Sequence, residues 1–505
     1  MKLIALVATA LLVGLTGCAS TPGTSSSAPV EPPKAASAPS GSEPAARAAA
    51  TSSSGPLLPI TPAQAGAQSV ADSSPPKDLW ERIRRGFGIP NLEGDLVHER
   101  EQWYASRPDY ISRMSERSSK YMFHIVEELE RRNMPTELAL LPYIESAFNP
   151  QAVSSAKAAG MWQFIPSTGK HFALKQNIFR DDRRDVLAST NAALNYLQKL
   201  YGMFGDWQLA LAAYNWGEGS VGRAMAKNQR AGLSTGYTDL NMPAETRLYI
   251  PKLQAVKNIV ANPDSLNVRL PDIPNHPYFQ QVPITRDIDV ALAAKLAGVQ
   301  LSDFKALNPS ANRPVILASG TPQILLPWDD ATVFQRNLDA YTGGKLASWT
   351  AWIAPQTMKP ADAAKVVGMG EAEFRSINQI PPRMLVKAGS TLLVTRSAHK
   401  TEDVTMQVAD NAQLSLAPEI VLKKTLVKAR QADTVASLAK RFNVSVASVA
   451  EWNKVGASAS FKKGQQVVVF LPVKPRVAKV KAAGSASHFA HKSAPTSVTT
   501  RVAKR

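Results

Sequence analysis

Cysteine is nearly absent from this sequence, since Cys18 is the only one among 505 residues. A disulfide within the chain is therefore excluded, and packing and hydrogen bonds must hold the fold together. The seven histidines are scattered, and the sequence shows no phosphate-binding loop, zinc-ligand spacing or RNA-binding signature. We therefore expect no metal site, no cofactor and no nucleic-acid partner.

Long apolar runs are scarce as well, and the N-terminal one is short. It covers Leu3 to Leu15 and follows Lys2. Its length and its flanks are typical of a secretory signal, and it is too short to span a bilayer stably.

The end of this run carries the only cysteine, in the sequence Leu15-Thr16-Gly17-Cys18. These four residues resemble the bacterial lipobox, whose cysteine becomes the lipidated first residue of the mature protein. The resemblance implies a lipoprotein signal peptide over residues 1–17 and a lipid anchor on Cys18. Because Ala19 rather than Asp follows, it also implies the outer membrane of a Gram-negative bacterium, facing the periplasm. An ordinary cleaved signal with a chance cysteine is the alternative.

Two further segments have compositions that cannot build a core. Residues 18–77 are rich in Ala, Ser, Pro and Thr, and residues 473–505 carry eight Lys or Arg without a single Asp or Glu. We expect a disordered tether and a disordered basic tail. The formal net charge of +18 indicates an anionic neighbour, such as a lipid surface or an acidic polymer.

Between these ends, residues 78–272 show helical periodicity in several segments. Apolar residues share one face from about Ser112 to Arg132, and a shorter helix is expected from Thr136, as N-cap, to Asn149-Pro150. Further helices are expected over Asp185–Tyr201, from Trp207 into Ala213–Gly219, and from Pro243 to Val260.

Glu145 is the carboxylate that stands out in these helices. In helical phase it shares a face with Leu138, Leu141 and Phe148, so we expect its carboxyl on the buried edge. Apolar surroundings penalise the ionised form and raise the pKa, which suits a general acid at neutral pH. The alternative is an ordinary Glu that caps a helix or pairs with a cation.

Three more blocks follow Glu145-Ser146. They are Gly160-Met161-Trp162-Gln163-Phe164, Ala213-Tyr214-Asn215-Trp216-Gly217, and Glu245-Thr246 with Tyr249 and Lys252. Together, the four blocks resemble the Slt-type lytic transglycosylases of glycoside hydrolase family 23. The resemblance implies a mainly helical, lysozyme-like catalytic domain that cleaves the bond between N-acetylmuramic acid and N-acetylglucosamine in peptidoglycan.

The same resemblance implies roles for individual residues. Glu145 matches the family's catalytic glutamate. The implied substrate-binding residues are Ser146, Met161, Gln163, Tyr214, Asn215, Glu245 and Tyr249. Met161 departs from the Leu that is commoner in the family, a change that conserves volume.

The chemistry of a single carboxylate can be argued independently of that resemblance. Hydrolytic glycosidases usually use two carboxylates. After Glu145 the next ones in sequence are Asp181 and Asp182, and Glu245 can approach only through the fold. This absence favours a mechanism in which the substrate supplies its own nucleophile, and the resemblance implies that this is the O6 hydroxyl, which closes a 1,6-anhydro ring without consuming water. A lysozyme-like muramidase hydrolase and a non-catalytic peptidoglycan-binding scaffold are the alternatives.

The C-terminal half contains a threefold repeat of an apolar helical segment, an Asn, a Gly eleven or twelve residues later and a β-branched or leucine run. The Asn and Gly pairs are Asn308 with Gly320, Asn378 with Gly389, and Asn453 with Gly464. The repeat resembles the βααβ LysM module, which implies binding of glycans that contain N-acetylglucosamine. The first two copies are degenerate, so a structural spacer is the alternative reading for them.

The sequence therefore predicts a multidomain chain in which a mainly α catalytic domain precedes small α+β modules. The helical domain is expected over 78–272, and the first, second and third modules over 276–328, 348–396 and 423–472. The expected partners are peptidoglycan strands and, through Cys18, a membrane.

Overall fold

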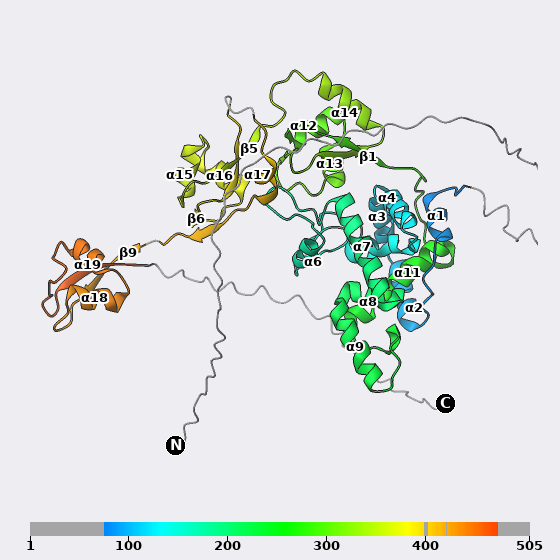
Figure 1. Cartoon of the computed structure of the whole chain (residues 1–505), viewed down its shortest axis with the longest axis horizontal. Coiled ribbons are helices and arrows are strands. Elements are labelled where there is room, and N and C mark those ends of the chain that lie inside the picture. The colour runs from blue at the N-terminus through cyan, green and yellow to red at the C-terminus, as the bar shows by residue number, and fades with distance from the viewer. Residues whose placement is uncertain (1–74, 398–401, 421, 473–505) are drawn as a thin grey trace, which may run out of the picture. The chain divides into compact units, whose positions relative to one another are not determined.

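The computed structural model describes residues 75–397, 402–420 and 422–472. The predicted signal peptide, Cys18, nearly all of the predicted tether and the basic tail lie outside the described residues. The parts that are described have the predicted fold class, a helical domain followed by small modules that contain strands (Figure 1).

The helical domain consists of short helices, which Figure 1 shows as one group coloured from blue to green. Its α-helices are α1 (Leu79–Arg85), α2 (Asp95–Ala105), α3 (Pro108–Ser119), α4 (Met122–Arg131), α5 (Leu141–Ser146), α6 (Pro166–His171), α7 (Val186–Phe204), α8 (Trp207–Trp216), α9 (Glu218–Arg230), α10 (Ala244–Arg247) and α11 (Tyr249–Ala261). Three 3₁₀ helices cover Thr136–Leu140, Tyr237–Asp239 and Pro263–Leu266.

Two helices predicted as continuous are interrupted. The segment from Ser112 to Arg132 breaks before α4, where Tyr121 has a φ of −122°. The ring of Tyr121 is buried, and its hydroxyl donates to the carbonyl of Ala306 at 2.9 Å, a partner far along the chain that local periodicity does not reveal. The segment after Pro243 is likewise split into α10 and α11 at Leu248.

The short helix before Glu145 also differs from its prediction. Thr136 is not an N-cap but opens a 3₁₀ helix, and its hydroxyl donates to the carbonyl of Ile83. Pro142 lies in the first turn of a new helix, α5, where its missing N–H costs nothing. The proline therefore restarts the helix one turn before Glu145.

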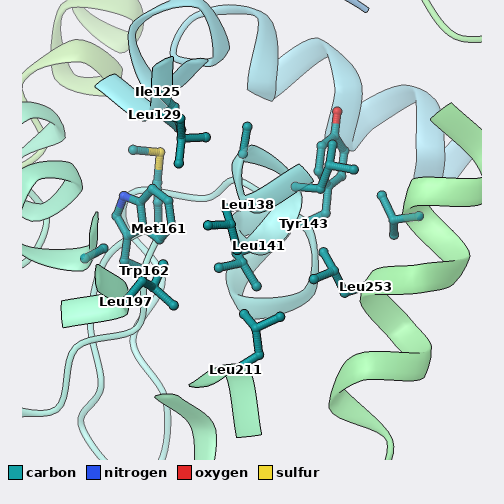
Figure 2. Close-up of a cluster of buried hydrophobic side chains, with 14 of the residues drawn as sticks. Ile125, Leu129, Leu138, Leu141, Tyr143, Met161, Trp162, Leu197, Leu211 and Leu253 are labelled. Atoms are coloured by element: carbon teal, nitrogen blue, oxygen red, sulfur yellow. The ribbon is translucent and has the colours of Figure 1, made fainter. Parts of the chain in front are cut away.

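The core of the helical domain forms around this restarted helix. Leu138 and Leu141 precede Glu145 and are fully buried, as is Phe148 just after it. Figure 2 shows Leu138 and Leu141 among Leu197, Leu211 and other core side chains of neighbouring helices. The predicted buried face of the Glu145 segment is confirmed, and its packing fixes where the carboxylate points.

The modules repeat one arrangement, in which two helices are enclosed between the paired strands of a small sheet. The first module contains β1 (Phe279–Pro283), β2 (Ile288–Asp289), α12 (Val290–Ala297), α13 (Leu301–Leu307), β3 (Val315–Ile316) and β4 (Gln323–Pro327), and α14 (Asp330–Asp339) follows it. The second contains β5 (Trp349–Ile353), α15 (Pro360–Val366), α16 (Glu371–Asn378), β6 (Met384–Val386) and β7 (Thr391–Thr395), followed by α17 (Met406–Asn411) and β8 (Leu416–Pro418). The third contains β9 (Leu422–Lys428), α18 (Val435–Phe442), α19 (Val446–Asn453) and β10 (Gln466–Pro472). The outer strands pair antiparallel, β1 with β4, β5 with β7, and β9 with β10.

The repeated asparagine has the same role in each module. The side chain of Asn308 donates to the carbonyl of Leu325 and accepts from its N–H, both at 2.8 Å. Asn378 and Asn453 bind the last strands of their modules in the same way, at Leu393 and Val468. The asparagine thus clips the end of the second helix to the last strand, which explains its place in the repeat.

Among the described residues, none of the helices combines the length and the apolar character needed to cross a bilayer.

Candidate active site

Glu145 lies near the end of α5, at the wall of a cleft of about 510 Å³. Ser146 ends α5, and the two residues after it, Ala147 and Phe148, have φ values of 51° and 55°, in the left-handed region, so the chain turns away sharply after the helix. The other residues that line the cleft are Ile144, Ser154, Ala156, Ala158, Gln163, Phe164, Ile165, Thr168, Tyr196, Tyr214, Asn215, Trp216, Gly217, Glu245, Tyr249 and Lys252.

The environment of Glu145 raises its pKa to about 7. Burial of the carboxyl is the main cause, and the negative charge of Glu245 adds to it. The hydroxyl of Tyr249, which donates to Oε1 at 2.5 Å, and the positive charge of Lys252 oppose the rise. The carboxyl therefore exchanges its proton near neutral pH, as the helical phase predicts.

Gln163 reaches the cleft from a tight turn between Ala159 and Phe164. The turn needs glycine at Gly160, which has a φ of 86° and where a Cβ would lie 2.0 Å from the carbonyl oxygen of Arg183. Gln163 itself has a φ of 50°, and its Nε2 donates to the carbonyl of Gly160 at 2.8 Å. This bond fixes the amide and leaves its Oε1 available to a ligand.

Two predicted substrate-binding residues do not line the cleft. The side chain of Met161 is fully buried, because the turn directs it and Trp162 into the core (Figure 2). Ser146 points toward the same turn and donates to the carbonyl of Met161 at 2.9 Å. The Met161 side chain therefore packs in the core and Ser146 ties the Glu145 helix to the turn, so substrate binding by these two residues stays a prediction.

Tyr214 and Asn215 enter the cleft from the last turn of α8. The hydroxyl of Tyr214 donates to the carbonyl of Trp162 at 2.9 Å. The side-chain carbonyl of Asn215 accepts from the hydroxyl of Thr246 at 2.8 Å, which leaves its NH₂ group to donate to a ligand. α8 ends at Gly217, whose φ of 89° opens the backbone toward the cleft.

Glu245 and Tyr249, predicted from the last block, both line the cleft. Glu245 is exposed on α10, whereas Tyr249 is buried at the start of α11. Sequence reasoning placed Lys252 in the same block but gave it no role, although its charge acts on Glu145. It missed Tyr196 because that residue lies within an apolar helical stripe whose periodicity indicates only core.

Family models match three parts of the chain. The family model described as Transglycosylase SLT domain matches residues 122–235. The model for the LysM-like domain of lytic transglycosylase MltD matches residues 278–343, and that for the LysM domain matches residues 427–470.

Individual relatives extend the likeness over most of the chain. The sequence is 33% identical over 420 residues to membrane-bound lytic murein transglycosylase D of Escherichia coli strain K12, covering 79% of this chain and 86% of that one. It is 36% identical over 200 residues to a protein of Alteromonas sp. (strain M-1) named for tributyltin chloride resistance, covering 38% of this chain and 91% of that one. Among solved structures, the 70 kDa soluble lytic transglycosylase of E. coli matches 28% of this chain and 23% of its own, at 24% identity and a TM-score of 0.21.

Proposed function

The chain belongs to the family of membrane-bound lytic murein transglycosylase D and is a peptidoglycan lytic transglycosylase, and from this premise we propose that Glu145 alone serves as its general acid and general base. The bond cut is the β-1,4 bond between N-acetylmuramic acid and N-acetylglucosamine. The product is a 1,6-anhydro-muramic acid end, and no water is consumed.

The observation that carries this proposal is the pKa of Glu145, which the buried cleft raises to about 7. A group with a pKa near the working pH can both give and take a proton within one cycle. Because Tyr249 donates to Oε1, the acidic proton belongs on Oε2. Tyr249 thereby orients the carboxyl as well as stabilising its ionised form.

The reaction then takes two proton transfers. In the first, Glu145 gives its proton to the glycosidic oxygen while the bond from C1 of muramic acid to that oxygen breaks. The N-acetyl group of the same sugar stabilises the positive charge at C1, and the NH₂ group of Asn215 is free to hold the N-acetyl carbonyl. In the second, the ionised Glu145 takes the proton of the C6 hydroxyl while O6 bonds to C1. The proton is thus regenerated on Glu145.

Glu245 is the feature that favours the alternative of a hydrolase. It lines the same cleft, and its charge raises the pKa of Glu145. A second carboxylate can activate water in a glycosidase. Glu245 is exposed, however, whereas Glu145 sits on the buried edge of the core, so we assign Glu245 to substrate positioning.

Mass spectrometry of sacculus digests tests these assignments. We expect muropeptides with anhydro ends, each lighter by one water than the reducing product that a hydrolase releases. A digest with reducing ends alone would support the hydrolase, and a digest without any released fragments would support a non-catalytic scaffold. The Glu245→Gln variant should release the same anhydro product, and a loss equal to that of a Glu145→Gln variant would overturn the single-carboxylate mechanism.

We further propose that Cys18 is lipidated and tethers the enzyme to the outer membrane, facing the periplasm. The lipobox sequence supports this, as does the membrane-bound relative, although Cys18 lies outside the described residues. A Cys18→Ala variant should lose incorporation of labelled fatty acid and leave the outer-membrane fraction. Label on that variant equal to the wild type would refute the assignment.

The third module is the part that we propose docks on the glycan. It matches the LysM model and forms a core from its own residues. An isolated fragment of residues 423–472 should sediment with purified peptidoglycan, and a fragment that stays in the supernatant counts against this role.

A further inference from the structure

A second hollow, distinct from the cleft at Glu145, lies between the helical domain and the first module. Its volume is about 990 Å³, and its cationic lining residues are Arg113, Arg117, Lys120, Lys305 and Arg313. We call it the basic pocket. The loop that follows Glu145 contributes to both hollows, because residues 149–151 line the basic pocket and Ser154 lines the cleft.

Specific contacts hold the two walls of the basic pocket together. Lys120 of the helical domain pairs with Asp303 of α13 at 2.6 Å. The backbone N–H of Asn312 donates to the carbonyl of Phe179 at 2.7 Å, and that of Asp181 donates to the carbonyl of Ser310 at 2.9 Å. Because these bonds join backbone as well as side chains, the pocket is a built feature of the fold.

The cations of the basic pocket are only partly neutralised. Asp303 neutralises Lys120, and the guanidinium of Arg313 donates to the carbonyls of Ile178 and Ile377. Glu116 is the one carboxylate that lines the pocket within the part of the chain that the structure describes.

Three cations remain for a ligand. Arg113 and Lys305 are exposed, and neither has an ion-pair partner among the described residues. The Nε of Arg117 is buried in the pocket wall without a hydrogen-bond partner. The guanidinium groups of Arg113 and Arg117 line the pocket and are suited to carboxylates, which accept bidentate hydrogen bonds from Arg.

We propose that the basic pocket binds carboxylates of the peptide attached to a peptidoglycan strand while the strand itself occupies the cleft. The volume lies at the upper end of the range for small-ligand sites, about 300 to 1,000 Å³, and suits a short peptide. The shared loop makes the two hollows neighbours along one binding surface. This inference rests on peptidoglycan as the substrate, but it does not depend on the role of Glu145.

The test uses the full chain and soluble stem peptide released from peptidoglycan by an amidase. Calorimetry at low salt should detect binding, and the double variant Arg113→Gln with Lys305→Gln should weaken it by about tenfold to a hundredfold, since each charge-assisted bond contributes about a factor of ten. The matched control is Lys295→Gln with Arg336→Gln, which removes the same charge from exposed positions of α12 and α14 that do not line the pocket. The control should bind as the wild type does.

Kinetics provide a second readout. On strands that carry peptides the pocket variant should raise KM several-fold and leave kcat unchanged, whereas on strands stripped of peptides both constants should match the wild type. Absence of peptide binding by the wild type overturns the proposal, as does an equal rise of KM on stripped strands. Loss of binding to anionic phospholipid vesicles, with peptide binding intact, would identify a lipid site instead. An active Glu145→Gln variant would overturn the proposed mechanism alone, because the calorimetry does not measure turnover.

Discussion

The first and third modules share one fold but use it differently. In both, an asparagine at the end of the second helix, Asn308 or Asn453, binds the backbone of the last strand through two hydrogen bonds. The modules differ in what surrounds this clip. The core of the third is drawn from residues 427–467 alone, whereas Leu307 and Leu325 of the first belong to the core of the helical domain.

The loop between the second helix and the last strand shows the same contrast. In the first module, the Ser310 carbonyl accepts a hydrogen bond from the helical domain, and the Asn312 N–H donates one to it. In the third module the corresponding loop bonds within the module, from Phe461 to Asp433 and from Gly464 to Ala429. The first module is thus bonded to the helical domain, whereas the loop of the third module is bonded within that module. This division supports a structural role for the degenerate first copy.

The Glu145→Gln variant should show the largest difference between cleavage by the helical domain and wall binding by the third module. Loss of a general acid typically lowers the rate by about 10² to 10⁴. Release of anhydro-muropeptides should fall by that factor while sedimentation with sacculi stays unchanged, because the third module is untouched. Near-normal release would refute the role of Glu145.

Removal of residues 419–505 should have the opposite effect. Without the third module, retention on sacculi should fall about tenfold or more, because one of two linked binding sites is lost. Cleavage of soluble strands should continue, since the first module remains in place. A collapse of that cleavage would show that the third module also supports the cleft.

The free energy of unfolding of the helical domain should depend on pH through Glu145, a residue that the modules lack. Burial raises the pKa of Glu145 from 4.5 to about 7, so the folded state keeps a proton that the unfolded chain releases between these values. The resulting stabilisation is fully present below pH 4.5 and is lost as the pH rises through 7. At 1.36 kcal/mol per unit, discounted for partial exposure, Glu145→Gln should raise the free energy of unfolding of the helical domain by about 1 to 3 kcal/mol above pH 7.

Urea unfolding of the variant and the wild type at pH 4.5 and pH 8 checks this expectation. The gain should appear at pH 8 only. An equal gain at both pH values would indicate a packing effect rather than the titration of Glu145.

Much of the site could be predicted from local pattern. Leu141 and Phe148 are buried as helical phase predicts, but only Leu141 shares α5 with Glu145, since the helix ends before Phe148. The side that Met161 faces could not be predicted, since it depends on a turn in which the distant carbonyl of Arg183 leaves no room for a Cβ at Gly160. The break at Tyr121 has the same origin, a hydrogen bond to Ala306 across the chain.

The repeat shows a similar limit. Its spacing revealed that Asn308 matters, but not that it clips a strand, and nothing local indicated that this copy is fastened to the helical domain. Such contacts join residues far apart in sequence, where periodicity and composition carry no information.

The two clips can be compared directly by Asn308→Ala and Asn453→Ala. Each substitution leaves a backbone N–H and carbonyl of the last strand without partners, at a cost of about 1 to 3 kcal/mol. Asn308→Ala should lower the stability of the helical domain and its cleavage at 37 °C, whereas Asn453→Ala should weaken only sedimentation with sacculi. Thermal unfolding and the two assays measure these effects. Equal losses of cleavage in the two variants would contradict the different roles of the two modules.

The smallest effect is expected at a glycine of the third module. Gly464 has a φ of 83°, a left-handed conformation, so Gly464→Ala should cost about 1 kcal/mol of that module's stability. Gly456 lies in the same loop without a positive φ, and a Cβ there meets nothing within 4 Å. Gly456→Ala should therefore be neutral or slightly stabilising, because alanine restricts the unfolded chain. Chemical unfolding of the isolated 423–472 fragment measures both, and equal losses would mean that the loop responds to bulk rather than to backbone conformation.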